Sequence, residues 1–222
     1  MADPKPFTWS FSSYNDFFNC PLAYKLERIV KSIPYVETEA MKYGTECHLH
    51  LENRMVKKTT LPDHLGWMEP MMTGIENRGG EAIAEQQMAI TRGLEPTGWF
   101  AKNTWCRGII DGGVRMRNKS ILYDYKSGKR KHNHEQLTLF AALEFAHFPL
   151  VKKVVTGYIW LKDKKIDSKE FSREDLPSIW GHFLPKVELM EQAHLEDKFP
   201  PKPSGLCNPW CGATPAQCKF KK

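Results

Sequence analysis

Two aspartates and a lysine, each next to an apolar stretch, are the residue types that metal-assisted hydrolysis requires. Asp111 and Asp124 lie at equal distances from a turn at residues 117–118. An antiparallel hairpin centred on that turn makes the two aspartates cross-strand partners, about 5 Å apart at Cβ and on one face. Lys126 points to the same face as Asp124, because side chains alternate along a strand, and Tyr125 points to the other. The hairpin therefore predicts two carboxylates and an ammonium in one place.

Two carboxylates held face to face repel each other unless a positive charge lies between them. A hard divalent cation such as Mg²⁺ or Mn²⁺ meets this need, because it takes oxygen ligands and leaves positions for water and phosphate. Such an ion lowers the pKa of a bound water and stabilises charge on a phosphodiester. Lys126 would then steer that water or hold the scissile phosphate. The alternative is a surface hairpin with solvated acids, since D-x-K occurs often by chance. The apolar residues before both aspartates favour a site.

A run of basic residues follows this hairpin directly. It consists of Lys129, Arg130, Lys131 and His132. Lysine and arginine contact the phosphates of the DNA backbone without regard to base sequence. A solvated loop is the alternative, and the nearby acids favour a DNA-binding loop.

The composition and net charge of the chain are consistent with a globular protein that binds DNA. The chain has 222 residues, enough for one hydrophobic core, and its 41% hydrophobic and 26% charged residues are typical of a globular protein. The formal net charge of +6 mildly favours a polyanionic partner. No secretory h-region and no membrane-spanning apolar run occur, so we expect a cytoplasmic protein of a prokaryotic or phage-infected cell, without a membrane partner. Protein partners are left open.

Periodicity predicts helices, then strands, then a late helix. We expect Ser12 or Ser13 to cap the first helix. The predicted helices are 13–19, 21–30, 37–58, 64–78, 134–148 and 174–197, and the predicted strands are 81–91, 103–117, 120–127, 153–163 and 165–172. This order predicts an α/β (α+β) fold with a central mixed sheet flanked by helices. One domain over 1–222 is expected, with the helical segment 1–35 packing against the Cys-rich tail 199–222.

Five motifs in order resemble the RecB-like branch of the PD-(D/E)xK nuclease superfamily, which includes AddB-type nuclease domains, CRISPR-adaptation nucleases and phage exonucleases. They span nearly the whole chain: SFSSYNDFFNCPLAY, GTECHLHLE, AIAEQQ, GIID with DYKSG, and EQLTLF. The last resembles the family's Q-x-x-x-Y helix, but Phe140 stands in place of the tyrosine. That difference puts a hydroxyl contact in doubt and leaves the metal ligands untouched. The resemblance implies a restriction-endonuclease-like core.

The resemblance also implies roles for particular residues. The metal ligands are expected to be His48, Asp111, Asp124 and the backbone carbonyl of Tyr125. Lys126 is expected to assist the attacking water, and Gln136 to lie near the DNA or to orient the site. Glu85 is expected as an outer ligand or a residue of a second metal.

Four cysteines are spread over both ends of the chain: Cys20, Cys207, Cys211 and Cys218. One N-terminal and three C-terminal cysteines resemble the iron–sulfur staple of AddB and of CRISPR-adaptation nucleases. The spacing here, C-x3-C-x6-C, is looser than in those relatives. Four thiolates bind either a [4Fe–4S] cluster, which we favour, or structural zinc. The expected role is to tie the two ends of the chain together.

We therefore expect a metal-dependent DNA nuclease. An exonuclease on the ends of single-stranded or duplex DNA is favoured, in phage or mobile-element recombination, repair or DNA degradation, since the chain holds the nuclease domain alone. A structure-selective endonuclease is the alternative within the class. Two further alternatives are a non-catalytic nucleic-acid-binding module and an interaction protein built on the metal-binding tail.

Overall fold

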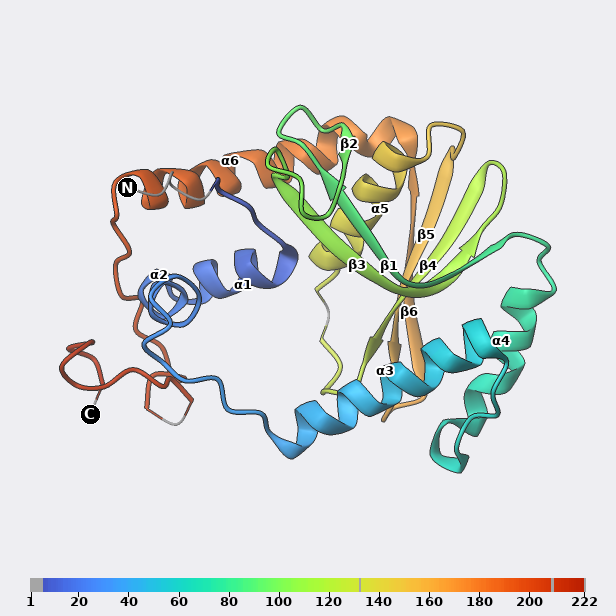
Figure 1. Cartoon of the computed structure of the whole chain (residues 1–222), viewed down its shortest axis with the longest axis horizontal. Helices are drawn as coiled ribbons and strands as arrows, with labels where there is room; N and C mark the ends of the chain where they lie inside the picture. The colour runs from blue at the N-terminus through green and yellow to red at the C-terminus, as the bar shows by residue number, and fades with distance from the viewer. Residues whose placement is uncertain (1–5, 132, 209, 222) are drawn as a thin grey trace. The chain divides into compact units, whose positions relative to one another are not determined.

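A computed structural model of the chain describes residues 6–131, 133–208 and 210–221. Its centre is a six-stranded mixed sheet in the order β2-β1-β3-β4-β5-β6 (Figure 1). The strands are β1 (Glu81–Ile90), β2 (Pro96–Thr97), β3 (Cys106–Arg115), β4 (Lys119–Lys126), β5 (Lys153–Trp160) and β6 (Lys165–Ser172). The predicted fold class is confirmed, and β2 is an additional short strand that periodicity does not indicate.

Helices form the rest of the regular structure. They are α1 (Phe11–Asn19), α2 (Pro21–Tyr24) continued by a π turn (Lys25–Ile29), α3 (Glu39–Lys57), α4 (Glu69–Glu76), α5 (Glu135–His147) and α6 (Leu176–Leu195). Among the described helices, none has both the length and the apolar character that a bilayer crossing requires.

The strand β4 runs parallel to β5, and α5 is the crossover between them, while the other neighbouring strands are antiparallel. A parallel pair needs such a connection because its two strands start at the same edge. Eight residues of α5 are buried, including Leu137 and Leu143. Buried all round, α5 shows little amphipathic pattern, and it covers the face of the sheet opposite α3.

The face toward α3 carries its own core. Cys47, Leu51 and Met55 of α3 pack in one buried cluster with Val114 and Tyr125 of the sheet. The cluster fixes α3 against the strands that bear Asp111 and Asp124. The site is therefore positioned by a core on each side of the sheet.

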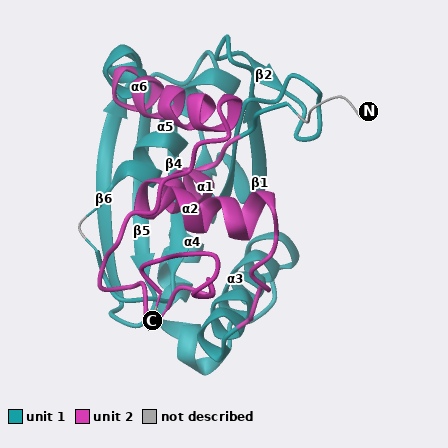
Figure 2. Cartoon of the chain, turned by 90° about the vertical axis from the view of Figure 1, so that its left-hand side faces the viewer, with its two compact units in different colours: residues 1–8, 38–180 teal, residues 9–37, 181–222 magenta. Residues whose placement is uncertain are grey.

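Contacts divide the chain into two compact units (Figure 2). Unit 1 contains residues 38–180 with the stretch before Trp9, and so holds the whole sheet with α3, α4 and α5. Unit 2 joins residues 9–37 to the chain from Gly181 onward. Within unit 2 the ring of Trp9 lies 6.0 Å from that of Phe183, and the Tyr24 hydroxyl lies 2.9 Å from His194 Nε2. One domain over 1–222 stays a prediction.

Two local predictions were wrong. Ser10, and neither Ser12 nor Ser13, is the N-cap of α1, because Ser10 and Ser13 exchange side-chain and backbone hydrogen bonds in a capping box. The predicted helix 64–78 is a 3₁₀ turn (Asp63–Met68) followed by α4. Pro70 has no N–H to donate and is tolerated only in a first turn, so α4 starts beside it.

Candidate active site

The hairpin of β3 and β4 has the predicted register. The last pairs along it are Gly113 with Leu122 and Gly112 with Tyr123. Asp111 and Asp124 are the next residues of each strand, just beyond the paired ladder. Both are buried, at 8% and 3% exposure. The two carboxylates thus stand where the strands part.

The two aspartates do not share one face, contrary to the sequence prediction. Asp111 Oδ2 lies 3.6 Å from His48 Nδ1 on the α3 side, while Asp124 Oδ1 accepts a hydrogen bond of 2.7 Å from Gln136 Nε2 of α5. A Cβ at Gly112 would meet the Tyr125 hydroxyl at 2.3 Å, so Gly112 faces α3 as well. Two consecutive residues therefore point to the same side, which breaks the alternation as a bulge does.

Gly113 permits this irregularity. Its φ is +155°, and a Cβ at this position would lie 2.1 Å from Ile121 O, so the backbone leaves room for glycine alone. The nearby backbone still supports the site, because the Tyr125 N–H donates to Asp111 Oδ2 at 2.7 Å. Asp111 is thus tied to the strand that carries Asp124 even though it turns to the other face.

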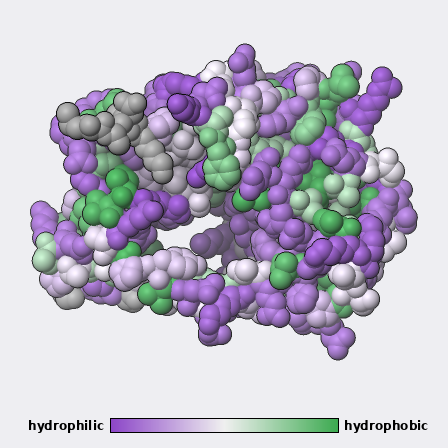
Figure 3. Space-filling view, in the orientation of Figure 1, coloured by the Kyte–Doolittle hydropathy of each residue, from purple (hydrophilic) through white to green (hydrophobic). Residues whose placement is uncertain are grey.

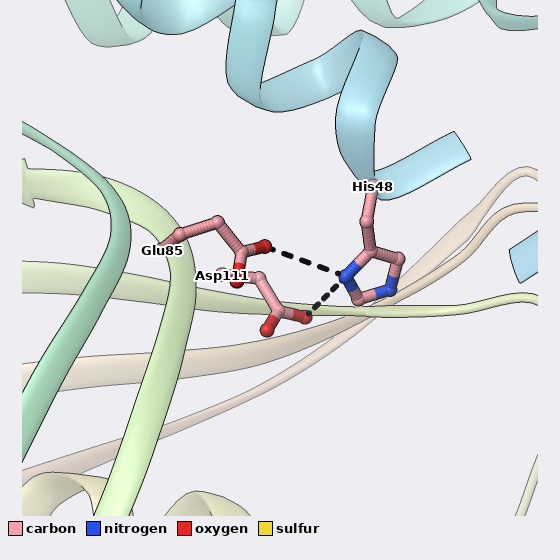
Figure 4. Close-up of side chains that lie close together, drawn as sticks. All are labelled: His48, Glu85 and Asp111. Carbon is pink, nitrogen blue, oxygen red and sulfur yellow. Dashed lines mark ion pairs between the residues drawn. The ribbon is translucent and has the colours of Figure 1, made fainter. Parts of the chain in front are cut away.

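His48 lies on α3 at the α3-facing side of the sheet, with its two ring nitrogens in different surroundings. Nε2 lies 3.0 Å from the Tyr125 carbonyl oxygen, and Nδ1 lies 3.6 Å from both Glu85 Oε1 and Asp111 Oδ2 (Figure 4). A metal-ligating histidine commonly donates its second N–H to a backbone carbonyl, which fixes the ring. The Tyr125 carbonyl, expected as a metal ligand, is here the hydrogen-bond partner of His48.

Close approach of α3 to the end of β4 depends on Gly44. A Cβ there would lie 2.9 Å from Ser127 Oγ, directly after Lys126. The helix begins at Thr38, whose hydroxyl accepts from the Met41 N–H. The glycine of the GTECHLHLE motif thus brings His48 within reach of the strand ends.

Glu85 joins the site through an unusual backbone. Its φ of +44° is uncommon for a residue other than glycine, and it lies between the pairs Ala84–Gly112 and Gln86–Ile110. Such conformations cost free energy and cluster at functional sites. The ligand atoms of His48, Glu85 and Asp111 all lie within 4.8 Å of one another. One imidazole and two carboxylates suit a divalent cation.

On the α5 side, Lys126 and Gln136 complete a hydrogen-bonded chain with Asp124. Lys126 Nζ lies 2.6 Å from Asp124 Oδ2 and donates to Gln136 Oε1 at 3.0 Å. The Lys126 ammonium also lies 5.4 Å from the ring centre of Tyr158, a neighbour that the sequence did not indicate. Phe140 is 3% exposed and packs toward Gly108, so the residue that departs from the family pattern belongs to the core.

The pKa values of the titratable groups in the site are shifted by burial and by the neighbouring charges. Burial raises the pKa of Asp111 to about 8, and the neighbouring Asp124 charge adds to the rise. Burial likewise raises the pKa of Asp124. Burial lowers the pKa of His48, but its bond with Glu85, the Asp111 charge and the Tyr125 carbonyl outweigh it and bring the pKa to about 9. In this site the protonated His48 ring offsets the repulsion between the carboxylates. A bound cation would take over this role.

The basic loop after Lys126 contains one arginine that is ion-paired. Arg130 Nε donates to Asp167 Oδ2 at 2.6 Å, and Arg130 Nη2 forms a second contact with the same carboxylate. Asp167 also accepts from Trp160 Nε1 at 2.7 Å. Arg130 therefore holds the loop to β6, and it is exposed, as are Lys129 and Lys131. His132 lies outside the described residues.

Cys20, Cys207, Cys211 and Cys218 line one pocket within unit 2. The Lys202 N–H donates to Cys20 Sγ at 3.4 Å, and the Ser204 N–H donates to Cys207 Sγ at 3.2 Å. Among the described residues, no three of these sulfurs lie within 4.8 Å of one another. Tetrahedral zinc at about 2.3 Å from each sulfur requires about 3.8 Å between sulfurs. Cys47 and Cys106 are buried elsewhere, at 0% exposure.

Comparison with known proteins decides the family. The model of the PD-(D/E)XK nuclease superfamily matches residues 8–221. The chain belongs to this superfamily. Membership implies a metal-dependent phosphodiesterase that acts on nucleic acid, and a His–Glu–Asp cluster of the kind that can hold a metal ion is present.

One solved structure agrees on the fold. A protein described as a "putative exonuclease" from Eubacterium rectale aligns with a TM-score of 0.52 and 11% identity, over 90% of this chain and 85% of that one. The crystal structure of SSO0001 aligns with a TM-score of 0.40 and 18% identity, over 84% of this chain and 77% of that one. No curated protein matches the chain.

Proposed function

We propose that this PD-(D/E)XK nuclease is a divalent-metal-dependent DNA exonuclease of the RecB-like branch. It acts on DNA ends in phage or mobile-element recombination, repair or degradation. The observation that carries the proposal is the meeting of His48, Glu85 and Asp111, within 4.8 Å at their ligand atoms, beside the Asp124–Lys126–Gln136 chain. Three separate elements, α3, β1 and β3, supply the first three side chains.

The residues that would hold Mg²⁺ or Mn²⁺ are His48 through Nδ1, Glu85 and Asp111. Asp124, expected from the sequence as a further ligand, is instead bonded to Gln136 and Lys126 beside this cluster. A bound divalent cation supplies water at a lowered pKa and offsets the charge that develops on the phosphodiester. The Tyr125 carbonyl keeps the His48 ring in place through Nε2, so Nδ1 faces the carboxylates. The Tyr125 N–H does the same for Asp111.

Lys126 is the residue placed to act on the attacking water or the scissile phosphate. Its ammonium is held between Asp124 and Gln136, which confines it to the strand end. Gln136 binds both Asp124 and Lys126, so it is a positioning residue. The exposed Lys129 and Lys131 follow directly and are placed to contact the DNA backbone.

Digestion of end-labelled linear, circular and single-stranded DNA with Mg²⁺ or Mn²⁺ tests the proposal. We expect cleavage of linear substrates from their ends, and its loss in Asp111→Asn. Asp63→Asn, which changes an exposed aspartate elsewhere in unit 1, should cleave normally. Cleavage of circular DNA would favour an endonuclease. Equal outcomes for wild type and Asp111→Asn, with DNA binding retained, would favour a non-catalytic binding module.

For the four cysteines of unit 2 we propose a structural [4Fe–4S] cluster, with zinc as the alternative. The shared pocket and the two N–H···S bonds support a group held by thiolates, since such bonds are usual at cluster sulfurs. Anaerobic purification with absorption spectra and metal analysis tests this. One zinc per chain would reject the cluster.

A further inference from the structure

One exposed strip of the sheet leads away from the metal-ligand cluster. Gln86 faces α5, because Arg115 Nη2 donates to it at 2.8 Å while also binding Glu144 of α5. A Cβ at Gly108 would likewise meet Leu143 of α5 at 2.9 Å. The intervening residues of β1 and β3 therefore face the other way, toward the side of Glu85 and Asp111.

This strip is exposed in its middle. Gln87 of β1 pairs with Ile109 of β3, and both are exposed, Ile109 at 36%. The next pair along the same face is Ala89, which is buried, with Arg107, which is half-buried. The Arg107 guanidinium stacks on the Trp99 ring at 4.9 Å. Exposed sheet surface thus lies between the carboxylates and an arginine–tryptophan pair.

The strip ends at the loop of residues 91–105, which carries β2 and extends past the ends of β1 and β3 (Figure 1). The loop is tied by its own hydrogen bonds. Thr104 Oγ1 donates to Gly98 O at 2.7 Å, and Thr97 Oγ1 donates to Asn103 Oδ1 at 2.9 Å. The short bridge of β2 to β1 fixes its start. Its side chains are therefore presented by an ordered backbone.

Phe100 is the most exposed large apolar residue of the described chain, at 88% exposure, and it sits beside Trp99 on this loop. Hydrophilic residues predominate on the face shown in Figure 3, where hydrophobic ones form small separate patches. Three cations accompany the two aromatic rings: Arg92, Lys102 and Arg107, against one carboxylate, Glu95. Phe100 is thus an exposed ring beside a half-buried tryptophan and among cations, and an aromatic ring in such surroundings can stack on an unpaired base while the cations bind its phosphate.

We propose that Trp99 and Phe100, with Arg107, form a stacking platform for a single DNA strand that enters the active site along the β1–β3 strip. The proposal rests on the proposed nuclease function and adds a site of strand binding to it. Arg107 holds a phosphate, and Phe100 stacks on a base. Charge complementarity with the polyanion selects DNA over an uncharged apolar partner as the occupant.

The distance along the strip sets the length of strand that reaches the platform. Arg107 precedes Asp111 by four residues of β3, or about 13 Å at 3.3 Å per residue. A strand with stacked bases advances about 3.4 Å per nucleotide, so the platform lies about four nucleotides from the metal-ligand cluster. Oligonucleotides shorter than about four nucleotides therefore cannot use it, whereas longer ones can.

Binding of single-stranded oligonucleotides of three to twelve nucleotides, measured in the Asp111→Asn background, tests the platform. Affinity should rise steeply once the strand exceeds about four nucleotides. Phe100→Ala should weaken binding of the longer strands by about tenfold and leave the shortest ones unchanged, whereas Phe100→Trp should restore it. Arg107→Ala should reduce the slope of log affinity against log salt by about one. Leu150→Ala, which removes another exposed apolar side chain at 71% exposure, is the matched control.

The outcomes separate the two proposals. Length-independent binding, or equal loss in Phe100→Ala and Leu150→Ala, overturns the platform. Wild-type protein that binds with this length dependence but does not cleave overturns the nuclease proposal and leaves the platform standing. Cleavage by wild type together with normal binding by Phe100→Ala overturns the platform and leaves the nuclease proposal standing.

Discussion

Metal binding at His48 and Asp111 should release protons, and the number released follows from the raised pKa values of these two groups. Burial raises the pKa of Asp111 to about 8, and the surrounding carboxylates bring that of His48 to about 9. In the metal-free protein at pH 7 this coupled pair therefore holds bound protons. A cation requires the carboxylate and the unprotonated Nδ1, so its binding displaces up to two protons.

The magnitude follows directly. Below pH 8 each unit of pH should raise the affinity for Mn²⁺ by up to a hundredfold, because each displaced proton contributes a factor of ten. Between pH 8 and 9 the rise should be about tenfold, and above pH 9 it should cease. His48→Asn should release one proton fewer, and its affinity should be less dependent on pH.

The stability of the metal-free protein should change with pH in the opposite sense to its metal affinity. Both pKa values are raised in the folded state, so the folded chain binds more protons than the unfolded chain. The contribution of Asp111 is fully present below about pH 4 and is lost as the pH rises through about 8. That of His48 is fully present below about pH 6.5 and is lost through about 9. The free energy of unfolding should therefore fall as the pH rises over this range, and Mn²⁺ should restore most stability at the alkaline end.

Titration calorimetry in two buffers of different ionisation enthalpy counts the protons at pH 7. Thermal unfolding between pH 5 and 9.5, with and without Mn²⁺, measures the stability. Zero proton release at pH 7, or an affinity that does not change between pH 6.5 and 9, would refute the reasoning. Such a result would mean that the ligands are already deprotonated before the metal binds.

Four further predictions follow from single residues. Lys126→Met should lower kcat far more than DNA affinity, by about a hundredfold, and a matching loss of affinity would contradict it. Glu144→Ala removes the buried carboxylate partner of Arg115 and leaves only the exposed Glu81 carboxylate to pair with it, so urea unfolding should show a loss of about 3 kcal/mol. Gly113→Ala should unfold the β3–β4 ladder or distort it, which circular dichroism and the melting temperature report; a normal melting temperature would show that the backbone can adapt. Cys211→Ser should lower the thermal stability of the anaerobically purified protein, and an unchanged melting curve would contradict a structural cluster.

The sequence was sufficient to predict the register of the β3–β4 hairpin but not the face of the sheet on which each aspartate lies. The turn at 117–118 fixes which residues of β3 and β4 are opposite, and that part of the prediction was confirmed. The side on which Asp111 emerges depends on the irregular backbone at Gly112 and Gly113. Glycine permits such a conformation without requiring it, so a one-dimensional pattern cannot reveal it. Glu85 is similar, since its left-handed backbone exists only because the neighbouring strands impose it.

Long-range pairing explains the other differences. Arg130 and Asp167 are 37 residues apart, and only the β5–β6 hairpin brings the carboxylate to the basic loop. The predicted DNA-binding cluster therefore contains one residue that is already neutralised, and nothing in the local sequence marks which one. The fold class was predictable because periodicity and the α5 crossover are local signals.

Tyr125 links the hydrophobic interior to the chemistry in a way that its side chain does not suggest. Its ring is 2% exposed among residues of α3 and β3, while its N–H and carbonyl hold Asp111 and His48. A change of volume in the buried cluster that surrounds this ring, at Met55 for example, would act on both ligands through Tyr125 without touching either. Natural variation in this interior is thus a route by which metal preference can drift between related chains whose catalytic motifs are identical.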